Sequence, residues 1–367
     1  MKKLFLIHPF IKNKMGIITS TQRFFLVCCN GVGPTQDVQT VLLKYINKKN
    51  FNLNSCTATG NTAVHVATAY NQVEVLNFFI DYINSHQNDP KNFSLDSRNN
   101  SGKTPLYFAA NNGFTDIMSI LIDNNVTVNT VDINGVSPIY AASNNGHTTV
   151  VKILIDNNAF INTRATAENT TPLLASCHNN HIEVAKHLID SGADTSIANI
   201  YGNGPLHVAT LRNCTEIARF LIIAECGLNC VNINNQTPLH IAVTNKNLTI
   251  SRILLQAGAD PHVYDSEGYT PLRIAIENCF VEFGKLYTSS NTYSNKPQTT
   301  VIIINKQRDD VCMLCLSEIS KNDQIAQYLC GHQLHLICYK NLIKTHPSNI
   351  NSCLSKCVMV TKSPNEM

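Results

Sequence analysis

The sequence predicts a mainly α-helical protein that ends in a small zinc-bound α+β domain. Two features of the 367-residue chain predict this fold class. A motif related to Thr-Pro-Leu-His recurs about every 33 residues through the middle of the chain, and Cys and His residues cluster near its C-terminus. A period of 33 residues is typical of stacked helical repeats. Thiolates and imidazoles at tetrahedral spacing are typical zinc ligands.

The composition of the chain argues against several classes of function. Hydrophobic residues make up 44% of the chain, as in a globular protein, and the formal net charge is only +3. No basic stripe is present, so nucleic acid is not an expected partner. No apolar run reaches the roughly 18–20 residues that span a bilayer, and we expect no transmembrane segment. Zinc-binding cysteines must stay reduced, which favours a cytoplasmic protein without excluding a nuclear one.

Seven copies of the motif define the repeats. They begin at Thr62, Thr104, Ser137, Thr171, Gly204, Thr237 and Thr270. This first residue is expected to cap a helix, and in six copies Pro follows at the first helical position. The Gly or Asn two residues before it predicts a left-handed backbone. The first interval is 42 residues instead of 33 or 34, so a loop near residues 88–99 should protrude.

Each repeat also predicts how its helices pack. A small residue that lets neighbouring helices approach comes five positions after the cap. These residues are Ala67, Ala109, Ala142, Ser176, Ala209, Ala242 and Ala275. A second segment follows with apolar residues at helical spacing, as in residues 150–155. In the last repeat, Phe283, Leu286 and Tyr287 predict a short second helix.

The motif at 237–242, Thr-Pro-Leu-His-Ile-Ala, followed by Gln-Ala-Gly-Ala-Asp at 256–260, resembles an ankyrin repeat. The resemblance implies an ankyrin-repeat domain of about seven units over 60–288, each a helix pair with a β-hairpin-like finger. Residues 37–59 would be a degraded capping unit, with a helix within 37–50, and residues 1–36 an N-terminal extension.

The resemblance also implies a surface that binds a protein substrate. The residue before each cap varies between repeats, which suits partner recognition but is equally compatible with a weakly constrained, solvent-exposed fingertip. The substrate-binding candidates are Lys103, Val136, Thr170, Asn203, Gln236 and Tyr269. His65, His207 and His240 share one repeat position. They lack the partners of a catalytic site, so we expect them to be structural.

Residues 289–310 predict a linker that includes a potential strand at 300–304. Eight metal-ligand residues follow. They are Cys312, Cys315, Cys330, His332, His335, Cys338, Cys353 and Cys357. Their order resembles a RING finger over residues 311–360, leaving 361–367 as a tail. The resemblance implies a cross-brace with two zinc ions. One would be held by Cys312, Cys315, His335 and Cys338, and the other by the remaining four residues.

Four protein ligands leave no open position on a zinc ion, so both zinc sites should be structural, and we expect no catalytic residue in the chain. RING fingers commonly act as ubiquitin ligases that hold a charged ubiquitin-conjugating enzyme near a substrate. By resemblance, Leu314 would contact that enzyme. The alternative is a non-catalytic adaptor or scaffold. It is favoured by the three residues between Cys353 and Cys357, where the family usually has two, and by Val358, where active members often have Arg or Lys.

Overall fold

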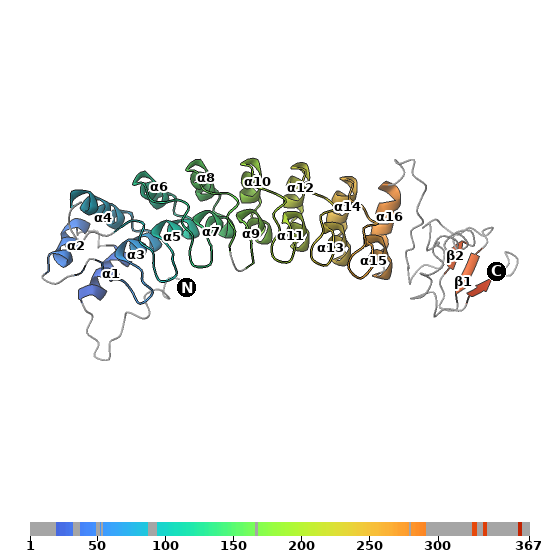
Figure 1. Cartoon of the computed structure of the whole chain (residues 1–367), viewed down its shortest axis with the longest axis horizontal. Coiled ribbons are helices and arrows are strands. Elements are labelled where there is room, and N and C mark those ends of the chain that lie inside the picture. Colours follow the sequence, from blue (N-terminus) through green and yellow to red (C-terminus); the bar gives the residue numbers. More distant parts are fainter. Residues whose placement is uncertain are drawn as a thin grey trace, which may run out of the picture. The chain divides into compact units, whose positions relative to one another are not determined.

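The computed structural model describes residues 20–31, 37–48, 52, 54–86, 94–165, 168–278 and 280–290, together with three short strands nearer the C-terminus. The chain divides into two compact parts, residues 1–200 and 201–367. In each part the helices alternate between two layers (Figure 1). The mainly α-helical repeat architecture expected from the sequence is therefore confirmed.

The first helix of each repeat starts one residue after the predicted cap. These helices are α3 (Ala63–Ala69), α5 (Pro105–Asn112), α7 (Pro138–Asn145), α9 (Pro172–His178), α11 (Pro205–Leu211), α13 (Pro238–Thr244) and α15 (Pro271–Glu277). Consecutive first helices pack together within each part, α3 with α5 and α11 with α13, for example. The seven small residues at the fifth position after the cap are completely buried, which is what this close packing requires.

The second helices form the other layer. They are α4 (Val73–Ser85), α6 (Thr115–Asp123), α8 (Thr148–Asp156), α10 (Ile182–Asp190), α12 (Thr215–Ile223), α14 (Leu248–Gln256) and α16 (Val281–Ser290). In α16, Phe283 and Tyr287 are buried, so the short last helix predicted from the sequence is present. No helix among the described residues is long and apolar enough to cross a membrane.

Local chemistry explains where the first helices begin. In five repeats the Thr or Ser cap accepts a hydrogen bond from the backbone N–H three residues later. This bond satisfies one of the free donors at a helix N-terminus. Gly204 has no side chain to do so, and Thr62 is bonded to the His65 ring instead. All seven Gly or Asn residues two positions before the cap have positive φ, between 54° and 78°.

The N-terminal end contains one more helix than expected. The helix predicted within 37–50 is present as α2 (Val38–Ile46), but α1 (Ser20–Asn30) lies in the segment expected to be an extension. Helix α1 packs on α3 and α2 packs on α4, so the pair occupies the place of a preceding repeat. Phe24 and Cys28 of α1 are almost completely buried. This segment lacks the cap followed by Pro that marks the repeats, and the repeat pattern therefore did not predict it.

The extra residues of the first interval are divided between a helix and a loop. Helix α4 has 13 residues, whereas the second helices from α6 to α14 have nine each. One additional helical turn therefore takes up part of the insertion. The predicted protruding loop falls partly on residues 87–93, outside the described part of the chain.

Near the C-terminus, three strands form a small antiparallel sheet. They are β1 (Ile325–Tyr328), β2 (Gln333–His335) and β3 (Met359–Thr361). The central strand β1 pairs with both others, with Ile325 opposite His335 and Tyr328 opposite Met359. The strand predicted at 300–304 lies outside the described residues.

Candidate functional site

The fingers between repeats are built by one recurring arrangement. In four of them an Asp or Asn side chain accepts the backbone N–H groups of the residues two and four positions later, at 2.8–3.0 Å. These residues are Asn99, Asp132, Asn232 and Asp265. A main-chain bond closes each turn, as from the Asp132 N–H to the Val136 carbonyl at 3.0 Å. Each finger tip is therefore held by its own backbone.

Neighbouring fingers are also joined to each other. The Ile133 N–H donates to the Ser101 carbonyl at 3.0 Å, and the Ile233 N–H donates to the Tyr201 carbonyl at 3.1 Å. One such bond links each of these pairs of fingers, like a single rung between two strands. Within each part, the fingers form a connected surface.

Four of the six predicted substrate-binding residues lie at the closing position of these turns, namely Lys103, Val136, Gln236 and Tyr269. Thr170 and Asn203 stand at the same repeat position in two other fingers. The sequence suggested an exposed fingertip, but all six residues are half-buried. Several of their side chains already contact the stack. Lys103 Nζ lies 4.4 Å from the centre of the Tyr107 ring, and Thr170 Oγ1 is 3.0 Å from the Tyr140 hydroxyl. Their role in substrate binding stays a prediction, and their contacts show that they also help to shape the fingers.

Three of these six residues are held by a histidine of the preceding repeat. The Nε2 atoms of His65, His207 and His240 lie 2.9, 2.9 and 3.1 Å from the carbonyl oxygens of Lys103, Gln236 and Tyr269. A carbonyl can only accept, so Nε2 carries the hydrogen and Nδ1 is left as an acceptor. In His240, Nδ1 accepts the Thr237 N–H at 3.0 Å. These contacts agree with the structural role expected for the histidines.

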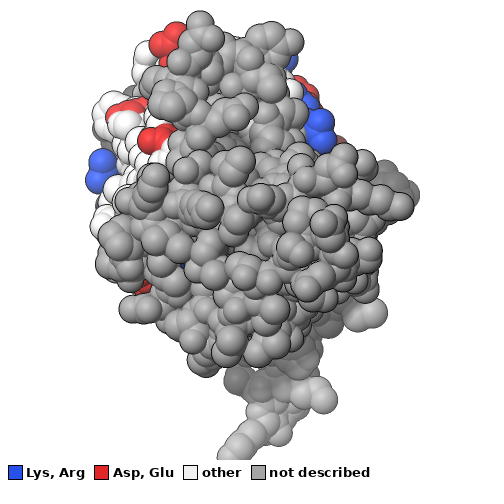
Figure 2. All heavy atoms as spheres, turned by 90° about the vertical axis from the view of Figure 1, so that its right-hand side faces the viewer, with Lys and Arg blue, Asp and Glu red and all other residues white. Residues whose placement is uncertain are grey.

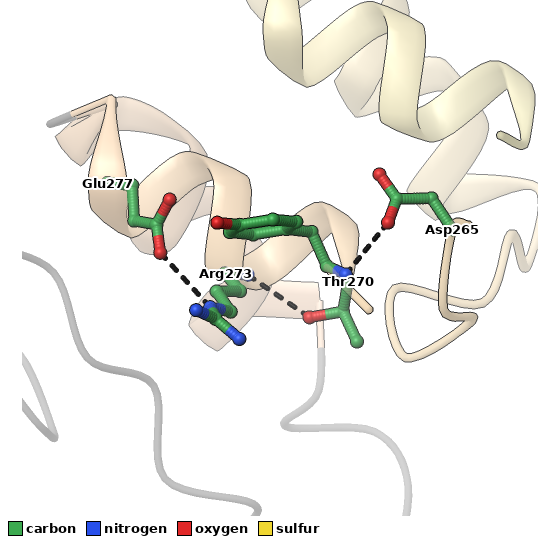
Figure 3. A network of polar contacts seen from close by, with 5 residues as sticks. Asp265, Thr270, Arg273 and Glu277 are labelled. Atoms are coloured by element: carbon green, nitrogen blue, oxygen red, sulfur yellow. Dashed lines mark hydrogen bonds and ion pairs between the residues drawn. The ribbon is translucent and has the colours of Figure 1, made fainter. Parts of the chain in front are cut away.

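Burial lowers the pKa of His65, His207 and His240, and the hydrogen bonds to carbonyls offset this only in part. The three rings are therefore neutral at pH 7, which matches the acceptor role of Nδ1. In the last repeat Arg273 takes the histidine position (Figure 3). Its Nε is 3.0 Å from Glu277 Oε1, and its guanidinium lies 4.3 Å from the centre of the Tyr269 ring.

Strongly exposed apolar side chains lie elsewhere on the fingers, three to six residues before the cap. In the N-terminal part, Ile133 is 68% exposed. In the C-terminal part, Ile233 and Tyr264 are 66% and 65% exposed. Val231, in the same finger as Ile233, and Tyr201, in the finger before it, are also exposed. Burial of such residues by a partner is favourable, at roughly 25 cal/mol per Å². The sequence contained the signal, an aliphatic or aromatic residue in an otherwise polar turn, but not its exposure.

The predicted zinc site cannot be placed from the described side chains. His335 lies in β2, but its side chain and the other seven ligand residues are outside the described part, as is Leu314. Elsewhere in the described residues, no group of three His, Cys, Asp or Glu side chains could hold a metal ion. On the described surface visible in Figure 2, Lys and Arg atoms and Asp and Glu atoms form small separate groups.

Helix pairs stacked through small residues, with linked fingers projecting from them, define a repeat protein that presents an interaction surface. A family model described as ankyrin repeats (3 copies) matches residues 85–165, 162–230 and 206–296. These matches cover more than half of the chain, so it belongs to the ankyrin-repeat family. Ankyrin repeats bind other proteins, and protein–protein interaction is the function that this family implies.

The comparison with solved structures agrees with this assignment. The crystal structure of the ankyrin repeat domain of Bcl-3, described as a unique member of the IkappaB protein family, is similar with a TM-score of 0.55. The two chains are 21% identical, and the match covers 62% of this chain and 99% of that one. At this identity the likeness shows the fold alone. Because 610 chains of solved structures match, the fold does not specify a partner. A search of curated proteins found no match.

Proposed function

We propose that the protein is a RING-type ubiquitin ligase in which the ankyrin fingers bind a protein substrate. In this proposal the C-terminal module, which follows the ankyrin repeats, binds two zinc ions and recruits a charged ubiquitin-conjugating enzyme. The chain then needs no nucleophile of its own, because holding the thioester and the substrate together supplies the rate increase. The observation that carries the proposal is the order and spacing of the eight Cys and His residues between 312 and 357.

The small sheet near the C-terminus is compatible with this proposal. The strands β1 and β2 pair antiparallel, and Cys330 and His332 lie between them in the sequence. A domain of about fifty residues buries too little apolar surface to be stable alone, and bound zinc would supply the missing stability.

The substrate would bind on the linked fingers. Apolar contact area is offered by the exposed side chain of Ile133 in the first part of the chain and by those of Ile233 and Tyr264 in the second part. The turns that carry them are held in place by their own hydrogen bonds. A preformed surface loses little conformational entropy on binding. Polar contacts would be added by the half-buried Lys103 in the first part, and by Gln236 and Tyr269 in the second part.

Autoubiquitination tests the ligase proposal directly. Purified full-length protein, incubated with activating enzyme, ubiquitin, ATP and a panel of conjugating enzymes, should form ubiquitin chains on itself. Leu314→Ala should reduce chain formation at least about tenfold, the loss expected when a central interface residue worth more than about 1.4 kcal/mol is removed. Bound zinc should be unchanged in this variant. Equal activity after replacement of both Cys312 and Cys315 by Ser would refute the mechanism.

A second function, a non-catalytic adaptor, has specific support. Cys353 and Cys357 are separated by three residues where the RING family usually has two, and Val358 follows where active members often have a basic residue. In that case the zinc module is only a docking surface. Direct binding to the conjugating-enzyme panel distinguishes the two, because an adaptor of this kind would bind none of its members while still capturing protein partners through the repeats.

A further inference from the structure

The extra turn of α4 opens a groove at the N-terminal end of the repeats. Helix α2 packs against α4 but has only nine residues, compared with 13 in α4. A cavity of about 620 Å³ lies between the two helices. The α4 residues that line it follow each other at helical spacing, from Glu74 through Phe78 and Asp81 to Tyr82, and His86 lines it just beyond the helix end. One face of α4 therefore forms a wall of the groove.

The charges in this groove have one sign. Asp37, Glu74 and Asp81 line it, and no Lys or Arg among the described residues does so. The Asp37 carboxylate accepts the backbone N–H and the hydroxyl of Thr40, which lowers its pKa. Glu74 and Asp81 are exposed, and neither forms an ion pair with another described residue. The groove thus presents uncompensated negative charge.

Aromatic side chains line the same groove. The rings of Phe78 and Tyr82 lie 6.2 Å apart, and the rings of Tyr82 and His86 stack at 4.3 Å. Phe78 and Tyr82 are half-buried, so part of each ring remains accessible from the groove. Aromatic faces attract cations, particularly when carboxylates lie nearby.

Each acidic residue taken alone has an ordinary explanation. Asp37 caps α2, and Glu74 is in the first turn of its helix, where Glu183 stands in α10. Asp81 corresponds to Asp190 of α10 in the repeat. What distinguishes this place is the added turn, which brings Tyr82, and His86 directly after the helix, beside the cavity that these carboxylates line.

The surroundings extend the negative charge. The next second helix, α6, carries Asp116 and Asp123, and neither α4 nor α6 contains a Lys or Arg. In contrast, α8 and α10 each contain a Lys. A positively charged segment that passed from the groove to α6 would meet the carboxylates of Asp116 and Asp123 and no Lys or Arg of that helix.

We propose that this groove binds a Lys or Arg side chain in a basic segment of a partner protein. The cation would lie over the aromatic faces of Phe78 and Tyr82, near Glu74 and Asp81, while its apolar stem fills the cavity. The inference is independent of the ligase proposal, because it concerns the opposite end of the chain and involves neither zinc nor the fingers.

Binding of a fluorescein-labelled (Gly-Arg)₄ peptide to the full-length protein tests the proposal by fluorescence anisotropy. The double variant Glu74→Gln/Asp81→Asn should weaken binding by about three- to tenfold, since each exposed charge contact contributes modestly. Tyr82→Leu should weaken it by about two- to fivefold through loss of the cation–π contact. The matched control is Glu183→Gln/Asp190→Asn, which makes the same charge change at the same helix positions of α10 and should leave affinity unchanged.

Helical circular dichroism would verify that all three variants are folded. Equal weakening by the groove and control variants would overturn the proposal in favour of general charge attraction, as would an unchanged affinity in both groove variants. The first 14 residues of the chain contain four Lys and no acidic residue. If the peptide binds only after deletion of residues 1–19, the chain's own basic segment is the occupant and the partner site is refuted.

Discussion

Replacing His240 by Leu tests how the stack holds its fingers. The imidazole is completely buried and joins two repeats, with Nδ1 3.0 Å from the Thr237 nitrogen and Nε2 3.1 Å from the Tyr269 oxygen. Leu has a similar volume, and Leu174 occupies the same repeat position next to the Thr171 cap. The substitution therefore removes hydrogen bonds without opening a large cavity.

The expected loss of stability follows from the hydrogen bonds that the two partners of His240 keep in the variant. The Tyr269 carbonyl keeps its bond from the Asp265 N–H at 2.9 Å. Thr237 is fully buried, and its N–H would lose the Nδ1 acceptor, which costs about 1–3 kcal/mol. A total near 2 kcal/mol should lower the melting temperature by about 4–8 °C for a repeat domain of this size. Tyr140→Phe, which removes only one hydroxyl at the same repeat position, should cost about 1 kcal/mol or less.

The pH dependence gives a second measurement. The pKa of His240 is lowered in the folded state, so the ring favours its neutral form there. The stability that this shift contributes is complete above the unfolded pKa of about 6.5 and is lost as pH falls below it. Melting temperatures between pH 7.5 and 5 should therefore fall less steeply for His240→Leu than for the wild type. The variant keeps the contributions of His65 and His207, whereas the wild type has those of all three histidines. Parallel pH profiles, or an equal loss in Tyr140→Phe, would refute the reasoning.

Three further predictions follow from single features. Gly202 and Gly268 both have positive φ, but a Cβ at Gly202 would lie 2.8 Å from the Ile233 nitrogen, whereas none of the described atoms lies within 4 Å of a Cβ at Gly268. In chemical denaturation, Gly268→Ala should therefore lower the free energy of unfolding by about 1 kcal/mol and Gly202→Ala clearly more. Equal losses would contradict the close approach of the Ile233 backbone. Elemental analysis should find two zinc ions per chain, and chelation should unfold the C-terminal module while the helical circular dichroism of the repeats persists. Folded protein without bound metal would refute the zinc assignment. Ile233→Lys should reduce partner capture in affinity pull-downs with less than about 0.5 kcal/mol change in stability. The control Ile223→Lys, on α12 and 77% exposed, should leave capture intact. An equal reduction by both variants would argue against partner binding by the fingers.

The repeat architecture could be predicted because its requirements are local. A cap, a Pro at the next position and a residue with positive φ two positions before the cap specify each helix start within five residues, and Gly, Asn, Thr and Ser are recognisable in the sequence. The small buried residues, such as Ala109 and Ala242, followed from the same period. The structural role of His65, His207 and His240 was also predictable, since no other reactive group stands near them in the sequence.

The parts that escaped prediction depend on contacts between repeats. The exposure of Gln236 is limited by a turn closed through Asn232 and by His207 from the preceding repeat, which no local pattern reveals. Helix α1 begins at Ser20, directly after Thr19, but lacks the cap-Pro motif of the repeats, and it is placed by burial of Phe24 and Cys28 against its neighbours. The extra turn of α4 was taken for loop because an insertion has no period of its own. The zinc module rests on spacing and resemblance, so its site stays a prediction.

The carbonyl of Gln236 accepts from the Asn232 N–H and from the ring of His207, so two repeats hold it at once. Such an anchor separates main-chain position from side-chain identity. The residue at position 236 can therefore be exchanged by mutation while the backbone of the finger keeps its position. In the substrate-binding role that we propose for this position, specificity could change one residue at a time, without a compensating substitution elsewhere.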